Sequence, residues 1–184
     1  YGPWEATWRH RGYEALLMDT VTAPDWVRDM ADTHQALVIA VLKRCLDLGM
    51  RPDGVFMVED LACERGLLFA PQTWRALFRP AVARLGEFLA HHGIDFWMHC
   101  CGNPAALFDD LIECGVRVMQ PLQVSAGLDA PTLRKRYGKR LVLYGNIDVK
   151  KMLGPRPTLE AEVRRKAVLA RAGGFIFHSD HSLP

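Results

Sequence analysis

The segment 98–103, with the sequence MHCCGN, holds the residue types of this chain that are best suited to metal chemistry. It follows a short apolar run at 94–98 and leads into Asn103 and Pro104, which together are typical of a helix start. His99 and Cys101 are two residues apart at the end of a predicted strand, so their side chains point to the same side. Histidine nitrogen and cysteine thiolate are preferred zinc ligands, and a catalytic zinc site uses three protein ligands and one open position. The pair therefore predicts part of a zinc site; the alternative is a strand end whose thiols are buried as small apolar groups.

A third ligand must come from the end of another strand. His181 is the first candidate, followed by Asp180, His178 and Glu59. The histidines at 178 and 181 have an alternative role, in hydrogen bonds to a carboxylated substrate or to backbone carbonyls. Zinc with an open position favours the thiolate form of a bound thiol, and so prepares a nucleophile near neutral pH.

Other polar residues follow further apolar runs. Glu59 and Asp60 could orient a ligand or act as catalytic acid and base, or they could be the solvated start of a loop. Four more residues at strand ends, together with His178, are candidates for substrate binding: Gln120, Gln123, Asn146 and Asp148. The alternative for Asn146 and Asp148 is to cap the loop that leads to Pro155.

Apolar runs of strand length alternate with helical patterns along most of the chain. Strands are predicted at 54–58, 94–98, 116–119, 141–144 and 175–177, with helices at 24–48, 71–93, 104–114, 129–137 and 158–172. Pro80 is predicted to interrupt the second helix. This alternation predicts a parallel α/β sheet, and polar residues at the carboxyl ends of its strands are the layout of a (β/α)8 barrel mouth. The competing doubly wound fold usually has a glycine-rich phosphate loop, which this sequence lacks.

A full barrel has eight units, so the chain is predicted to be an incomplete (β/α)8 TIM-type barrel with about five to six βα units. It begins at Tyr1 without a methionine and stops soon after a predicted strand. We therefore expect residues 1–184 to be a single barrel domain that is a C-terminal fragment.

Composition limits the class of protein. The formal net charge is +2 with no extended basic patch, which argues against a nucleic-acid partner or a membrane surface. No apolar run approaches the roughly 20 residues that span a bilayer. The five cysteines are an odd number without framework spacing, so we expect reduced thiols and a cytoplasmic protein.

Short motifs in a fixed order carry a family resemblance. They are Gly2-Pro3-Trp4 with Leu17 and Asp19, Val58-Glu59-Asp60, Ala70-Pro71 with Phe78-Arg79-Pro80, and the segments 99–103, 119–123, 127–129, 137–138, 145–148, 173–174 and 181–184. Together they resemble the uroporphyrinogen decarboxylase superfamily, a (β/α)8-barrel group that includes cobalamin-dependent and corrinoid-protein methyltransferases. The chain is nearer to the methyltransferase branch, and the resemblance covers nearly all of it.

The resemblance implies that the first strands and the last helix of the barrel are missing. It matches His99 and Cys101 to the zinc-binding His-x-Cys of the methyltransferase branch. That branch supplies a further cysteine near a late strand, where this chain has the sequence HSDH at 178–181, so the resemblance implies His or Asp as the third ligand. In the decarboxylase a late histidine binds substrate, and His181 could match it. The catalytic aspartate and arginine-rich segment of the decarboxylase would lie outside this chain.

The leading hypothesis is zinc-assisted methyl transfer between a corrinoid and a thiol or related acceptor, with zinc on His99, Cys101 and His181. The alternative is decarboxylation of uroporphyrinogen in tetrapyrrole (haem) biosynthesis, and a further alternative is a non-catalytic corrinoid- or tetrapyrrole-binding protein. The expected partners are a small-molecule substrate, a corrinoid protein that holds the methyl donor, and a second copy in a homodimer.

Overall fold

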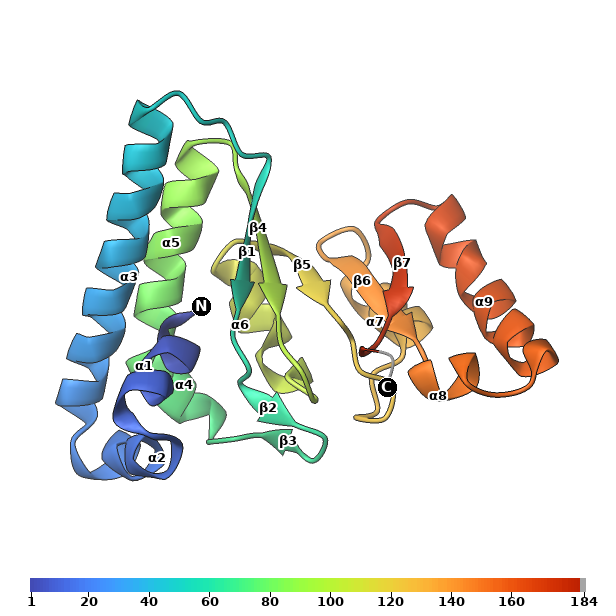
Figure 1. The fold of residues 1–184 in the computed structure, drawn as a ribbon, viewed down its shortest axis with the longest axis horizontal. Coiled ribbons are helices and arrows are strands. Elements are labelled where there is room, and N and C mark those ends of the chain that lie inside the picture. The colour runs from blue at the N-terminus through green and yellow to red at the C-terminus, as the bar shows by residue number, and fades with distance from the viewer. Residues whose placement is uncertain (183–184) are drawn as a thin grey trace.

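Five parallel strands form the main sheet of the computed structural model, which describes residues 1–182. Their order is β1-β4-β5-β6-β7, so each strand lies beside the next long strand of the chain (Figure 1). The strands are β1 (Gly54–Val58), β4 (Asp95–His99), β5 (Val116–Gln120), β6 (Val142–Ile147) and β7 (Phe175–Ser179). The predicted α/β fold is confirmed, and five parallel strands in chain order are consistent with a partial barrel. Leu183 and Pro184, the end of the motif at 181–184, lie outside the described residues.

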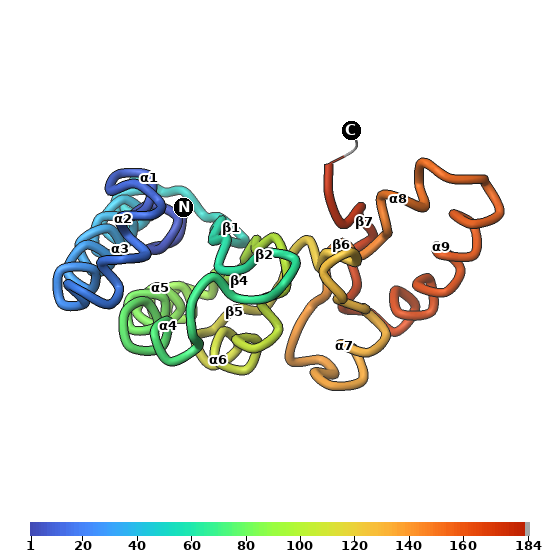
Figure 2. The backbone as a smooth tube through the Cα atoms, turned by 90° about the horizontal axis from the view of Figure 1, so that it is seen from below, coloured from blue at the N-terminus to red at the C-terminus, as the bar shows by residue number. Residues whose placement is uncertain are grey.

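Helices connect the strands and pack on one side of the sheet (Figure 2). They are α5 (Arg79–His91) on β4, α6 (Phe108–Glu113) on β5, α7 (Ala130–Tyr137) on β6 and α9 (Arg156–Arg171) on β7. The long helix α3 (Pro24–Asp47) precedes β1 and lies against α5. Charged residues recur along α3, and within the described chain no helix has the length and apolarity needed to cross a membrane.

Two helical regions refine the picture given by the sequence. The predicted helix at 71–93 is two helices, α4 (Pro71–Leu77) and α5, with Pro80 in the first turn of α5, where its missing N–H is not needed. The interruption predicted at Pro80 is therefore confirmed. Residues 1–23, which have no clear capping pattern, form α1 (Pro3–Arg11) and α2 (Tyr13–Thr22), joined at Gly12 with a φ of 95°.

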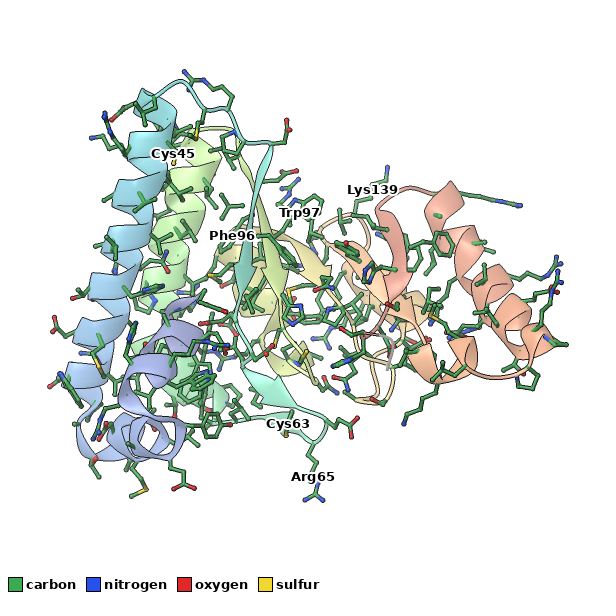
Figure 3. The ribbon with its side chains drawn as sticks, in the orientation of Figure 1. Cys45, Cys63, Arg65, Phe96, Trp97 and Lys139 are labelled. Carbon is green, nitrogen blue, oxygen red and sulfur yellow. The ribbon has the colours of Figure 1, made fainter. Side chains whose placement is uncertain are left out.

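Alternation along the strands gives the sheet two different faces. In β4, Phe96 and Met98 are buried against the helices, whereas Trp97 is half-buried on the opposite face (Figure 3). The opposite face also carries Phe56, which is 49% exposed, and Tyr144. The apolar core therefore lies between the sheet and its helices, and the polar strand ends lie at its edge.

Three short elements complete the edge where the strands end. The hairpin of β2 (Ala62–Cys63) and β3 (Gly66–Leu67) follows β1, the 3-10 turn η1 (Ala105–Leu107) precedes α6, and α8 (Val149–Met152) follows β6. Figure 3 shows Cys63 and Arg65 of the hairpin at this end of the molecule, opposite Lys139. The β2–β3 hairpin thus lies beyond the carboxyl ends of β1 and β4.

Candidate metal centre

Asp60, His99 and Cys101 form a compact group of potential metal ligands. One ligand atom from each lies within 4.8 Å of the others. The Sγ of Cys101 is 3.3 Å from Nε2 of His99, and that nitrogen is 3.6 Å from Oδ1 of Asp60. Strand register explains the grouping. Val58 pairs with His99 in the parallel β1–β4 ladder, so the segments that follow β1 and β4 leave the sheet side by side.

The imidazole of His99 is oriented by Gln120 on the neighbouring strand. The two residues are register partners between β4 and β5, and Nδ1 of His99 makes a hydrogen bond with Oε1 of Gln120. A carbonyl oxygen only accepts, so Nδ1 carries the proton and donates it. In the neutral ring, this tautomer leaves the lone pair on Nε2, which faces Cys101 and Asp60. This tautomer is the one that a metal ligand needs.

The backbone turn after His99 is held from three directions. Cys101 N donates to Oδ1 of Asp60 at 2.8 Å, and Gly102 N donates to Oε1 of Gln123 at 2.8 Å. Asn103 N donates to the carbonyl of Cys63 at 3.0 Å. The thiol of Cys101 is therefore presented by a turn whose successive N–H groups are all satisfied.

Electrostatics keep this thiol protonated when no cation is bound. Burial raises the pKa of Cys101 to about 11, and the carboxylate of Asp60 adds to the shift. A divalent cation between the three ligand atoms would reverse this effect, because it stabilises the thiolate. The negative charges of Asp60 and of a Cys101 thiolate would be balanced only by a bound cation, which is typical of a cation site.

The third ligand predicted from the sequence, His181, does not join this group. It is exposed and follows β7, which is separated from β4 by β5 and β6. At ~4.8 Å between neighbouring strands, β7 lies roughly 14 Å from β4. Asp60, predicted as a catalytic acid or base, lies where a third ligand is needed.

The comparisons with known proteins agree with this fold. A family model described as "Uroporphyrinogen decarboxylase (URO-D)" matches residues 1–184. The chain belongs to the URO-D family. No curated protein gives a match to the chain.

A solved structure with a similar fold is a methyltransferase from Methanosarcina mazei. The TM-score is 0.75 at 18% sequence identity, and the match covers 99% of this chain and 51% of that chain. At this identity the likeness shows the fold alone. The present URO-D family chain spans about half the length of that methyltransferase, in keeping with a partial barrel.

Glu59, predicted as a catalytic acid or base, has a structural position in this URO-D family chain. Its side chain is fully buried, and its two oxygens accept hydrogen bonds from Trp4 N and Glu5 N at 2.9 Å, in the first turn of α1. Burial raises the pKa of Glu59 to about 8, against the opposing effect of the two N–H donors. A Cβ on Gly2 would clash with this carboxylate. Glu59 therefore holds α1 against the end of β1 and is closed to substrate.

The residues predicted to bind substrate have mixed positions. Gln120 and Gln123 support the ligand turn, as described above. Asp148 caps α8 by accepting a hydrogen bond from Lys150 N at 2.9 Å. His178 is exposed, and its ring lies edge-on to Tyr144 with 5.3 Å between centroids. Of this set, His178 has the freest access to a ligand.

Asn146 is buried and uses its whole amide within the protein. Nδ2 donates to the carbonyls of Leu122 and Leu128, at 2.6 and 2.9 Å, and Oδ1 accepts from Ala130 N at 2.8 Å. Its backbone φ is 63°, a left-handed conformation that asparagine tolerates. Asn146 therefore fixes the 121–129 loop and has no amide donor left for a substrate.

Two buried groups were not assigned these roles from the sequence. Asp180 accepts hydrogen bonds from Val124 N and Val149 N, at 2.7 and 2.9 Å, and so joins the loops that follow β5, β6 and β7. Lys166 on α9 is fully buried, pairs with Glu162 and donates to the backbone carbonyl of Asn146. The i,i+4 spacing of Glu162 and Lys166 was the one signal available, and it more often marks an exposed pair.

All five cysteines are free thiols in the structure. Cys100 is buried, accepts a hydrogen bond from Leu61 N at 3.3 Å and lies outside the metal-ligand group. For Cys100, this position fits the alternative of a thiol buried as a small apolar group. Cys101 is the cysteine that belongs to the group.

Proposed function

We propose that this chain carries the zinc site of a URO-D family methyltransferase. In this proposal Asp60, His99 and Cys101 hold zinc, and the reaction transfers a methyl group from a corrinoid, held by a partner protein, to a thiol or related acceptor. The observation that carries the proposal is the convergence of an imidazole nitrogen, a thiol sulfur and a carboxylate oxygen within 4.8 Å.

The donor set fits zinc. One nitrogen, one sulfur and one oxygen are ligand types that zinc accepts, and three protein ligands leave a fourth position open. The side chains of His99 and Asp60 are 22% and 38% exposed, so an acceptor can approach from solvent. When bound, zinc acts as a Lewis acid that lowers the pKa of an acceptor thiol.

The protein's own groups each have a defined task. Gln120 keeps the proton of His99 on Nδ1, and the Cys101 thiol must lose its proton on metal binding. Asp60 accepts a hydrogen bond from Cys101 N and would supply a second negative charge to a bound dication. The Cys101 thiolate and the Asp60 carboxylate would together balance the charge of a bound zinc ion.

Decarboxylation of uroporphyrinogen remains the second candidate. The family description supports it, and the exposed His178 and His181 after β7 could donate to substrate carboxylates. This reaction needs no metal, so the Asp60–His99–Cys101 group would have no function in it. A binding protein without catalysis is the third candidate.

Metal content separates these candidates. We expect purified protein to contain one zinc per chain, the Cys101→Ser and His99→Ala variants to lose it, and a His178→Ala control to retain it. Methyl transfer from methylcobalamin to a thiol should fail in the same two variants. Zinc-free protein that cannot be loaded, or equal zinc in Cys101→Ser and wild type, contradicts the proposal.

A further inference from the structure

The turn that presents Cys101 is clamped between two loops from other parts of the chain. On one side lies the β2–β3 hairpin, whose Cys63 carbonyl accepts the Asn103 N–H at 3.0 Å. On the other side lies the 121–129 loop, whose Gln123 accepts the Gly102 N–H at 2.8 Å. Asn103 also donates from its side chain to the carbonyl of Ala126 at 2.9 Å. The ligand turn is thus fixed by groups that do not belong to its own strand.

Glu64, at the tip of the hairpin, connects the two sides of this clamp. One of its oxygens accepts from Nε2 of Gln123 at 3.2 Å and from the Ser125 hydroxyl at 2.7 Å. The same hydroxyl also lies 2.9 Å from Nε2 of Gln123. A carboxylate only accepts hydrogen bonds, so it draws the amide NH2 of Gln123 toward itself. The amide oxygen must then face the Gly102 N–H.

Close packing makes the turn sensitive to this clamp. Gly102 has a φ of 75°, and a Cβ at this position would lie 2.5 Å from the Cys63 carbonyl oxygen. The hairpin therefore approaches the backbone of the turn as closely as a glycine allows. A shift of the hairpin or of Gln123 would therefore move Gly102, and with it the adjacent Cys101.

We propose that Glu64 and Gln123 are positioning residues that set the place of the Cys101 sulfur in the metal site. This inference rests on the proposed zinc site and adds to it a support outside the ligands themselves. Residues that orient metal ligands commonly change metal affinity 10- to 100-fold when they are lost, roughly the scale expected here.

The test uses charge reversal at Glu64. Glu64→Lys places donors against the amide of Gln123 and favours the flipped amide, whose NH2 would face the Gly102 N–H. Glu64→Gln retains an acceptor oxygen and should rescue the site. Arg65→Ala, at the next position of the exposed tip, is the matched control. Gln123→Leu removes both sides of the link as a second disruptive variant.

Zinc affinity by chelator competition, the thiolate-to-cobalt charge-transfer band of Co²⁺-loaded protein and thermal unfolding of the metal-free form are measured for each variant. We expect Glu64→Lys and Gln123→Leu to lower zinc affinity about 10-fold and to alter the cobalt band, with the unfolding temperature unchanged for Glu64→Lys. Glu64→Gln and Arg65→Ala should resemble wild type.

Three results overturn different claims. If wild type binds zinc and Glu64→Lys binds it with the affinity and cobalt spectrum of Arg65→Ala, the positioning role is wrong and the zinc site stands. If Glu64→Lys loses zinc only in proportion to a lower unfolding temperature, the link is structural. If wild type itself takes up no zinc or cobalt, the proposed function fails first.

Discussion

The strand ends of β1 and β4 differ from those of β6 and β7, although both sets are rich in polar residues. At β1 and β4, the Asp60, His99 and Cys101 side chains are partly exposed and direct ligand atoms at one another. At β6 and β7, Asn146 and Asp180 are buried, and their side chains are bonded to backbone groups of neighbouring loops. Partly exposed side chains with lone pairs available, as in the first set, can bind a metal. Buried side chains whose polar atoms already have hydrogen-bond partners, as in the second set, stabilise the fold. The first set is the candidate site and the second is its scaffold.

The largest effect is expected at Glu162 on α9, whose partner Lys166 supports the scaffold by donating to the carbonyl of Asn146. Burial favours a raised pKa for its carboxyl, but hydrogen bonds from Lys151 and Lys166 outweigh burial and lower the pKa to about 2. Glu162→Gln leaves the buried ammonium of Lys166 without its charge partner and should cost about 3 kcal/mol of unfolding free energy at neutral pH. Denaturant titration measures this.

The same variant has a pH signature with a defined sign. The pKa of Glu162 is lower in the folded state, so its stabilisation is present above about pH 4.5 and is lost as the pH falls toward about 2. The difference in unfolding free energy between wild type and Glu162→Gln should therefore shrink over this range. A difference that is constant from neutral pH to pH 3 contradicts the ion pair.

A slightly smaller effect is expected at Asn146. Asn146→Ala leaves buried backbone groups of the 121–129 loop unpaired and places alanine, which tolerates the left-handed region less well than asparagine, at a φ of 63°; together these should cost about 2–3 kcal/mol. Asn146→Gly should be less destabilising than the alanine variant, because glycine relieves the backbone cost. If the unfolding free energy of Asn146→Ala equals that of wild type, Asn146 does not stabilise the scaffold.

The smallest effect belongs to the site region. Gln120→Leu removes the acceptor that holds the proton of His99 on Nδ1, and zinc affinity should fall about 10-fold, or about 1.4 kcal/mol, with unfolding free energy little changed. Gln120→Glu keeps an acceptor and serves as the control. If Gln120→Leu unfolds more easily but binds zinc normally, the division between site and scaffold is wrong.

The sequence predicted the fold because its signals are local. Each strand is an apolar run of about the right length, and helix stops such as Gly49, Gly115 and Gly138 are visible without a structure. The pair His99 and Cys101 was likewise predictable, since two residues on one strand end share a side by geometry alone.

The rest of the site depends on contacts between distant segments. Asp60 joins His99 only because Val58 and His99 are in register, and no residue type encodes that register. The role of Asn146 depends on a loop that turns back through Leu122 at a φ of 59°, a position where no glycine signals the bend. These are tertiary effects. The sequence therefore could not separate the polar residues at strand ends that form the candidate site from those that support the loops.

X-ray absorption at the zinc edge tests the central claim most directly. The zinc-loaded protein should show one sulfur neighbour at ~2.3 Å and nitrogen or oxygen neighbours at ~2.0–2.2 Å. Any zinc that Cys101→Ser still takes up at high metal concentration should lack the sulfur shell. A spectrum with oxygen and nitrogen neighbours alone in wild type, or with a sulfur shell that persists in Cys101→Ser, would contradict a zinc site built on Asp60, His99 and Cys101.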